Sequence, residues 1–291
     1  MRFIFLLFLI LFISVIFGGH FLVYYTIIKF FNIPNNQTKL IWLAITIALS
    51  FSLFISMALA HASNLSIVRW FYIVVSTWHG FLVNLFMASL LCWSIYATSK
   101  YINLNFNFKI ILSFLFLLAI TISIYGVWNA QHPRLKNISV KINNLPEQWQ
   151  NKKIIFISDI HLGAVNKAPF MEKVVEQING VKPELVLIGG DYFDGSLSEY
   201  NSLTDPLKKI ESKFGVFFVN GNHESYIGEL GADKALQAAG VKIVKNEIIN
   251  VDGLNIIGAD FTSDFGNKQG VEELLKKTKP DETNIFLHHE P

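Results

Sequence analysis

The chain has 291 residues, of which 52% are hydrophobic and only 16% are charged, and its mean hydropathy is positive. These values argue against an ordinary soluble enzyme. The charges are also unevenly distributed, because the first 130 residues contain six basic residues and no acidic residue. The rest of the chain contains the other 18 basic residues and all 22 acidic ones. The two parts therefore require different solvents, and the first part belongs in lipid.

The second part of the chain is slightly acidic yet rich in Val, Ile and Phe. This composition excludes intrinsic disorder, which requires few apolar residues, and it excludes a basic nucleic-acid-binding domain. We therefore expect no nucleic acid among its partners. Cys92 is the only cysteine in the sequence, so no intramolecular disulfide is possible.

Four long apolar stretches occupy the first part, and each is close to the roughly 20 residues that cross about 30 Å of hydrocarbon. Short polar connectors separate them, and Trp and Tyr lie near several of their ends, as is typical of interfacial anchors. The first stretch continues past Gly18 without a cleavage site, which indicates an anchor and not a signal peptide. We predict a four-helix transmembrane region over residues 1–130, with spans at about 3–31, 40–60, 71–96 and 110–128.

An even number of spans places the N-terminus and the C-terminal domain on the same side of the membrane. If that side is the cytoplasm, it carries five basic residues near the spans, against four on the other side. This small excess follows the positive-inside rule. We expect a multi-pass membrane protein whose C-terminal domain is cytoplasmic.

His20 and His79 lie within apolar stretches, and ionisable groups in spans often mark transport pathways. No span contains Asp or Glu, the carboxylate that a proton- or cation-coupled transporter normally needs. We therefore interpret both residues as neutral histidines that are hydrogen-bonded between helices or lie near an interface. A transporter is the alternative, and a flux assay in liposomes would test it.

The sequence changes in character after Trp128. Residues 131–149 are interpreted as a linker and a leading strand, and residues 150–291 as one α/β domain. A helix is predicted over residues 168–179, because its apolar residues follow helical spacing and Gly180 ends it. Four apolar runs are predicted to be buried strands, at residues 154–157, 185–188, 216–219 and 285–287.

Each predicted strand is followed by residues that can bind metal ions, at the end where ligand sites form in open α/β sheets. Asp159 and His161 are two residues apart, so on an extended segment their side chains would project to the same side. His288 and His289 are adjacent, so only one of them should reach a shared site. The four groups are Asp159 and His161, then Asp191, then Asn222-His223-Glu224, and finally His288-His289-Glu290.

In this order, and at separations of 32 and 31 residues from Asp159 to Asp191 to Asn222, these motifs resemble the calcineurin-like metallophosphoesterase family. The Gly-Asn-His-Glu element at residues 221–224 is the most specific motif, and the membrane-linked bacterial branch of the family is the most similar. The resemblance covers about residues 150–291. It implies a layered α/β sandwich and a two-metal site for the hydrolysis of phosphoesters.

The resemblance also implies which residues hold the two metals. Two ions together can bring hydroxide to a phosphoester and stabilise charge on the attacking and leaving oxygens. Mixed His, Asp and Asn ligands are compatible with Mn, Fe, Zn or Ni and do not choose among them. The ligands would be Asp159 and His161 for the first ion, Asp191 for both ions, and Asn222 and His289 for the second.

The Gly-Asn-His-Glu element has two further residues with implied catalytic roles. His223 would donate a hydrogen bond or a proton to the phosphoryl or leaving oxygen. Glu224 would orient the His223 imidazole. The His-Glu-Pro motif at the end of the sequence favours His289 over His288 as the metal ligand.

The family's last element, Gly-His-x-His, is absent from this sequence, which ends at Pro291. In the family this element follows the His289 position and supplies one histidine to each metal. We therefore interpret the domain as incomplete at its C-terminus, with a natural short form that has lost catalysis as the alternative. The chain as written is expected to bind metal weakly and to have little phosphoesterase activity.

The sequence thus predicts a multi-pass membrane protein whose C-terminal domain hydrolyses phosphomonoesters or phosphodiesters with two divalent metals. The tether beside a bilayer favours a lipid-linked phosphoester as substrate, and a soluble phosphoester at the membrane is nearly as well supported. The non-enzyme alternative is a membrane scaffold or sensor with a degenerate phosphoesterase-like domain.

Overall fold

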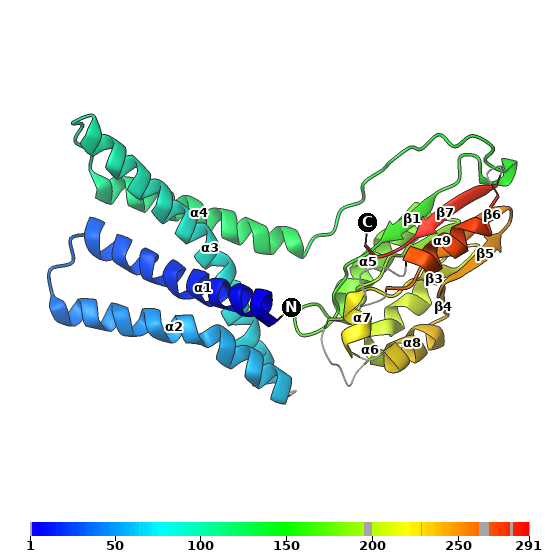
Figure 1. Cartoon of the computed structure of the whole chain (residues 1–291), viewed down its shortest axis with the longest axis horizontal. Coiled ribbons are helices and arrows are strands. Elements are labelled where there is room, and N and C mark those ends of the chain that lie inside the picture. The colour runs from blue at the N-terminus through cyan, green and yellow to red at the C-terminus, as the bar shows by residue number, and fades with distance from the viewer. Residues whose placement is uncertain are drawn as a thin grey trace. The chain divides into compact units, whose positions relative to one another are not determined.

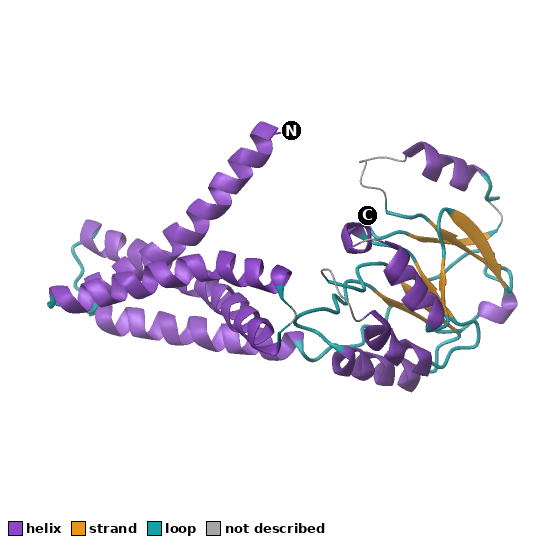
Figure 2. Cartoon of the chain, turned by 90° about the horizontal axis from the view of Figure 1, so that it is seen from below, coloured by secondary structure: helices purple, strands orange, loops and turns teal. Residues whose placement is uncertain are grey.

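The computed structural model describes residues 2–63, 65–194, 200–227, 229–261, 268–279 and 282–290. The chain divides into two compact units, Met1–His132 and Pro133–Pro291. The first unit is all helix, and the strands are gathered in the second (Figure 2). This division falls where the composition changes from apolar to mixed.

The N-terminal unit consists of four helices, α1 (Arg2–Phe30), α2 (Asn36–Ala62), α3 (Ser66–Tyr101) and α4 (Phe108–Ala130) (Figure 1). All four are long and apolar enough to cross a membrane, which confirms the four predicted spans. Asparagines begin two of them, because the Asn35 and Asn107 side chains accept hydrogen bonds from the backbone N–H groups of Gln37 and Lys109.

The outer surface of these helices is covered by large apolar side chains, and the core of the unit is small. Leu82, Leu85 and Cys92 of α3 pack in this core with Leu112 of α4. Helix α2 instead buries three serines, whose small side chains permit close helix packing. An apolar exterior around a narrow core is the pattern expected of helices solvated by lipid.

Side-chain hydrogen bonds link α3 to its neighbours within this unit. The Trp78 indole donates to His20 Nε2 at 3.0 Å, and the Trp93 indole donates to Thr26 Oγ1 at 2.9 Å. His20 Nδ1 also lies 2.9 Å from the Ile16 carbonyl oxygen. Both imidazole nitrogens of His20 therefore take part in hydrogen bonds, one with a neighbouring helix and one within its own helix. This agrees with the prediction that His20 is a hydrogen-bonded structural histidine.

The C-terminal unit contains two sheets. The first is fully parallel, in the order β1 (Ile154–Ile157), β2 (Leu185–Ile188), β3 (Val216–Phe218), β4 (Val241–Ile243). The second has the order β5 (Glu247–Val251), β6 (Leu254–Gly258), β7 (Thr283–Leu287), with β5 and β6 antiparallel and β6 and β7 parallel.

Strand β2 shows why this unit is layered. Its residues are all buried, and they alternate between two cores. Val186 and Ile188 pack with Met171 and other residues of the helices, whereas Leu185 and Leu187 pack against the second sheet. The fold is therefore a layered α/β sandwich, as predicted. The helices are α5 (Ala168–Val181), α6 (Tyr200–Thr204), α7 (Asn222–Ile227), α8 (Glu229–Ala238) and α9 (Lys268–Lys276), with short 3-10 helices at Glu147–Trp149 and Asp205–Lys209.

Several sequence-based predictions differ from the structure. Helix α5 runs through Gly180 and ends at Val181, because Lys182 adopts the left-handed conformation that closes the helix. Strand β3 ends at Phe218, one residue earlier than predicted. Residues 132–146 contain no strand, so the predicted leading strand is not formed in this segment.

Candidate metal centre

The carboxyl ends of β1, β2 and β3 meet at one edge of the parallel sheet, and the loops that follow them carry the predicted ligands. Strand β7 belongs to the second sheet, yet its following loop reaches the same place. There His289 Nδ1 lies 2.8 Å from the Gly189 carbonyl oxygen, at the end of β2. The fold therefore brings all four predicted motifs together.

The Asp159-Ile160-His161 segment is not extended, which corrects the reasoning that placed its two polar side chains on one side. Asp159 and His161 have φ angles of 55° and 48°, in the left-handed region. Backbone hydrogen bonds hold this shape, from Asp159 N to Gly190 O and from His161 N to Asp191 O. The two side chains still converge, because His161 Nε2 lies 3.8 Å from Asp159 Oδ1.

Asp191 lies at the centre of the site and is almost completely buried. Its Oδ2 atom is 3.6 Å from His161 Nε2, 3.4 Å from His289 Nε2 and 4.0 Å from His223 Nε2. Its Oδ1 atom accepts a hydrogen bond from the His223 backbone N–H at 3.0 Å. This position, between the two predicted ligand groups, is the one that a bridging carboxylate requires.

His289 and Asn222 provide a direct test of whether the site fits a metal. If His289 Nδ1 donates its hydrogen to Gly189 O, then Nε2 carries a lone pair. That lone pair faces Asn222 Oδ1 at 3.2 Å and Asp191 Oδ2 at 3.4 Å. Three acceptor atoms so close together repel one another unless a proton or a cation lies among them, so this donor set fits a divalent metal.

His288, the neighbour of His289, turns to other partners. Its ring stacks on Phe286 with centroids 5.8 Å apart, and its Nδ1 atom contacts the Glu290 carbonyl oxygen. The two histidines therefore point to different surroundings, and the His289 side chain is the one that contacts Asp191.

Glu224 has a different set of partners from the one expected, which corrects its predicted role. Its carboxylate is fully buried and accepts hydrogen bonds of 2.9–3.1 Å from four backbone N–H groups. These groups belong to Asp191, Tyr192, Phe193 and Gly221. The carboxylate therefore ties the loop after β2 to the loop after β3 instead of orienting the His223 imidazole.

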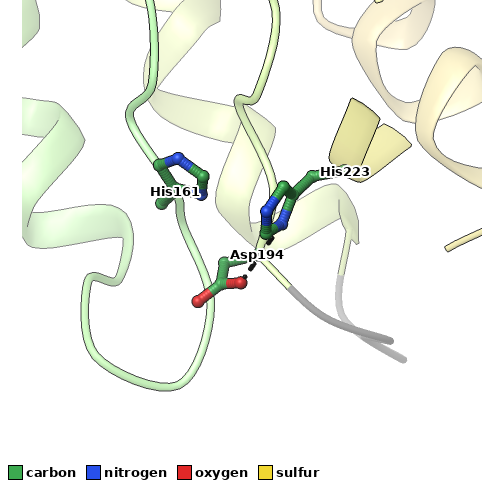
Figure 3. A group of neighbouring side chains, drawn as sticks. All are labelled: His161, Asp194 and His223. Carbon is green, nitrogen blue, oxygen red and sulfur yellow. Dashed lines mark ion pairs between the residues drawn. The ribbon is translucent and has the colours of Figure 1, made fainter. Parts of the chain in front are cut away.

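Asp194, which the sequence analysis missed, takes the orienting position. Its Oδ1 atom lies 3.3 Å from His223 Nδ1, and Figure 3 shows His161, Asp194 and His223 pointing toward one another. The signal in the sequence was a second carboxylate in the same loop as Asp191, three residues later. The sequence does not indicate that this part of the loop lies beside His223, which follows a different strand.

Among the residues that the structure describes, the titratable side chains form two groups that could hold a metal ion. One consists of Asp159, Asp191 and His289, and the other of His161, Asp194 and His223. In each group the ligand atoms lie within 4.8 Å of one another. His161 is also within 4 Å of both Asp159 and Asp191, so it lies between the two groups.

Tyr192 lies next to Asp191 but does not belong to the reactive groups. Burial raises the pKa of its phenol well above the ordinary value, so the phenol stays protonated. Its hydroxyl donates to the Leu203 carbonyl oxygen at 2.8 Å. Tyr192 therefore supports the loop from inside the core.

Gly190 allows the loops to approach closely. It has a φ of 91°, and an added Cβ would lie 2.7 Å from Gly221 N and 2.9 Å from His289 Nδ1. Any side chain at this position would push the loop after β3 and His289 away from Asp191. The distances around Asp191 therefore depend on this glycine.

A layered α/β domain with His and Asp clusters at the carboxyl edge of its parallel sheet is the architecture of a metal-dependent enzyme. Residues 152–291 match the calcineurin-like phosphoesterase family. The C-terminal domain of this chain therefore belongs to the calcineurin-like metallophosphoesterase family, in agreement with the resemblance of its motifs.

Several curated proteins are similar to the chain over this region. An uncharacterized metallophosphoesterase of Helicobacter pylori is 31% identical over 165 residues, which cover 55% of this chain and 43% of that protein. A transmembrane protein with metallophosphoesterase domain from Bos taurus is 29% identical, over 58% of this chain and 42% of that protein. An uncharacterized metallophosphoesterase of Aquifex aeolicus is 27% identical, over 60% of this chain and 68% of that protein.

The chain thus spans less than half the length of the first two of these relatives. The chain combines four helices that are long and apolar enough to cross a membrane with a domain that matches the calcineurin-like phosphoesterase family.

Proposed function

We propose that this protein is a membrane-anchored phosphoesterase that hydrolyses phosphomonoesters or phosphodiesters with two divalent metals. The observation that carries the proposal is the convergence of lone-pair atoms on Asp191, from His289 and Asn222 on one side and His161 on the other. Family membership supports the same reaction class.

The residues of the chain divide into two ligand sets around the shared carboxylate. Asp159 and His161 would hold one ion, and Asn222 and His289 the other, with Asp191 bound to both. Two bound ions supply a hydroxide nucleophile near neutral pH and positive charge for the phosphoryl oxygens. Manganese, iron, zinc and nickel all suit this mixture of ligands.

His223 is suited to protonate the leaving oxygen. Its Nδ1–H would be held by Asp194, which leaves Nε2 directed to the side of the Asp191 carboxylate, 4.0 Å away. As an imidazolium, His223 would transfer the Nε2 proton to the leaving alcohol oxygen and become neutral. Asp194 would stabilise the charged form and fix the orientation of the ring.

The four spans place the domain beside a bilayer, which supports a phosphoester found at membranes as substrate. A lipid-linked phosphoester and a soluble one at the membrane surface both satisfy this condition. The scaffold alternative differs in its consequence, because a scaffold would retain bound metal without turnover.

The proposal is tested by measuring the hydrolysis of a chromogenic phosphodiester in the presence of manganese. The chain used in the assay would include any further family motif that its source gene encodes. Asp191→Asn should sharply reduce both turnover and metal content, whereas His223→Ala should reduce turnover and keep the metals. Glu172→Gln, at an exposed carboxylate on α5, is the matched control and should change neither. Near wild-type turnover and metal content in Asp191→Asn would exclude the two-metal assignment.

A further inference from the structure

Tyr226 is an exposed aromatic residue next to the candidate reaction centre. It lies on α7, three residues after His223, which places the two side chains on the same face of the helix. The ring centroids are 6.1 Å apart and the planes are tilted by 55°. The Tyr226 side chain is largely open to solvent, since 73% of the residue is exposed.

Three side-chain rings contact one another in a row that begins at the site. His161 contacts His223 edge to face with centroids 4.6 Å apart, and His223 in turn contacts Tyr226. The His161 and His223 side chains are 34% and 30% exposed, so Tyr226 is by far the most exposed of the three rings. A group attached to the leaving oxygen beside His223 would therefore meet Tyr226 as the next side chain.

The chemistry of this contact favours a planar group. An exposed tyrosine ring presents a flat π face, which pairs with another ring at centroid distances of about 4.5–7 Å and strengthens binding beyond the burial of apolar area. Tyr226 is not among the residues that form the core beside the parallel sheet, so its exposed ring is free to contact a ligand.

We propose that Tyr226 is a specificity-determining residue that stacks on a planar aromatic leaving group, so that the substrate class is a phosphoester of an aromatic or nucleoside-like alcohol. This inference rests on the proposed function, because it assumes that the phosphoryl group is held at Asp191 and the leaving oxygen at His223. It goes beyond the proposed function because it names the leaving group as the part of the substrate that the chain recognises.

Two phosphonates test the inference without turnover. Benzylphosphonate and ethylphosphonate share the anionic group and have a methylene in place of the ester oxygen, and only the first has a ring. Their dissociation constants would be measured by calorimetry in detergent with excess manganese, on the same chain that is used for the hydrolysis assay. The wild type should bind benzylphosphonate about fivefold more tightly than ethylphosphonate.

Variants at two exposed positions separate stacking from general apolar contact. Tyr226→Phe should keep the preference for benzylphosphonate, and Tyr226→Ala should abolish it without weakening ethylphosphonate binding. Leu230→Ala, at an exposed apolar residue of α8, should leave the preference intact. Equal losses in Tyr226→Ala and Leu230→Ala would overturn the stacking.

The possible failures are distinguishable. If the wild type bound both phosphonates equally, Tyr226 would have no role in specificity while the phosphoryl site would stand. If the wild type bound neither phosphonate in the presence of manganese, the proposed function would fail, and the inference would fail with it.

Discussion

Asp191 and Glu224 show how two buried carboxylates in one site serve different purposes. Asp191 directs its Oδ2 atom to three imidazoles, whereas Glu224 directs both oxygens to backbone N–H groups. The first carboxylate is available to cations and the second is not. Their hydrogen-bond partners, and not their burial, separate the ligand from the structural residue.

Glu224→Gln should loosen the loops without removing any predicted ligand. The amide nitrogen would face two of the four backbone donors and leave them without an acceptor, either those of Asp191 and Gly221 or those of Tyr192 and Phe193. Each unsatisfied buried donor costs about 1–3 kcal/mol. Hydrogen-exchange mass spectrometry should show at least about tenfold faster exchange in peptides covering residues 191–193 and 221. Unchanged exchange there, with Glu172→Gln as the control, would show that the four bonds do not hold the loops.

Asp194→Asn tests the orienting role proposed for the missed carboxylate. The asparagine retains the shape but not the charge that stabilises the His223 imidazolium, so turnover should fall by about 10–100-fold. Metal content should stay at the wild-type value if His161 and Asp191 bind metal without Asp194. A loss of metal in this variant would instead assign Asp194 to the ligands.

At the scale of elements, the site depends on how closely the strand-end loops approach. Gly190 lies close to both the loop after β3 and the loop after β7. Because it has no side chain, these loops from two different sheets can approach each other. Strand register alone would not achieve this, because β7 is not in the same sheet as β2.

Gly190→Ala should therefore damage the site more than its backbone angle explains. Gly240 has a similar positive φ of 84° but no atom within 4 Å of an added Cβ, so Gly240→Ala is a matched control for conformational strain. We expect manganese affinity to fall at least about tenfold in Gly190→Ala and to be unchanged in Gly240→Ala. Equal effects in the two variants would attribute the loss to strain alone.

The apolar runs predicted the bounds of β1 and β2 to the residue. Strand β2 is buried on both faces, which explains its continuous apolar sequence. Strand β1 was also predicted to be buried, but it is only partly buried and exposes Phe156. Strand β7 extends two residues further than predicted, since its first residues, Thr283 and Asn284, are polar and carry no such signal. The partners of Glu224 could not be predicted either. They depend on left-handed conformations at residues such as Asp159 and Asp191, which no sequence pattern announces in a non-glycine residue.

At the scale of the whole molecule, the chain combines four helices that are long and apolar enough to cross a membrane with a metallophosphoesterase domain. In the described part of the bundle, the Trp78–His20 hydrogen bond joins two helices, whereas many serine and threonine hydroxyls donate to carbonyl oxygens of their own helix. The His and Asp groups that could hold a metal lie instead at the carboxyl edge of the parallel sheet. The cytoplasmic side of the membrane remains the prediction for this domain.

Direct localisation of bound manganese tests the central claim most directly. An anomalous diffraction map from crystals grown with excess manganese should show two peaks about 3.5–4 Å apart, both adjacent to the Asp191 carboxylate. The same crystals of Asp191→Asn should show a loss of both peaks. A single peak enclosed by His161, Asp194 and His223, or no peak near Asp191, would contradict the two-metal centre.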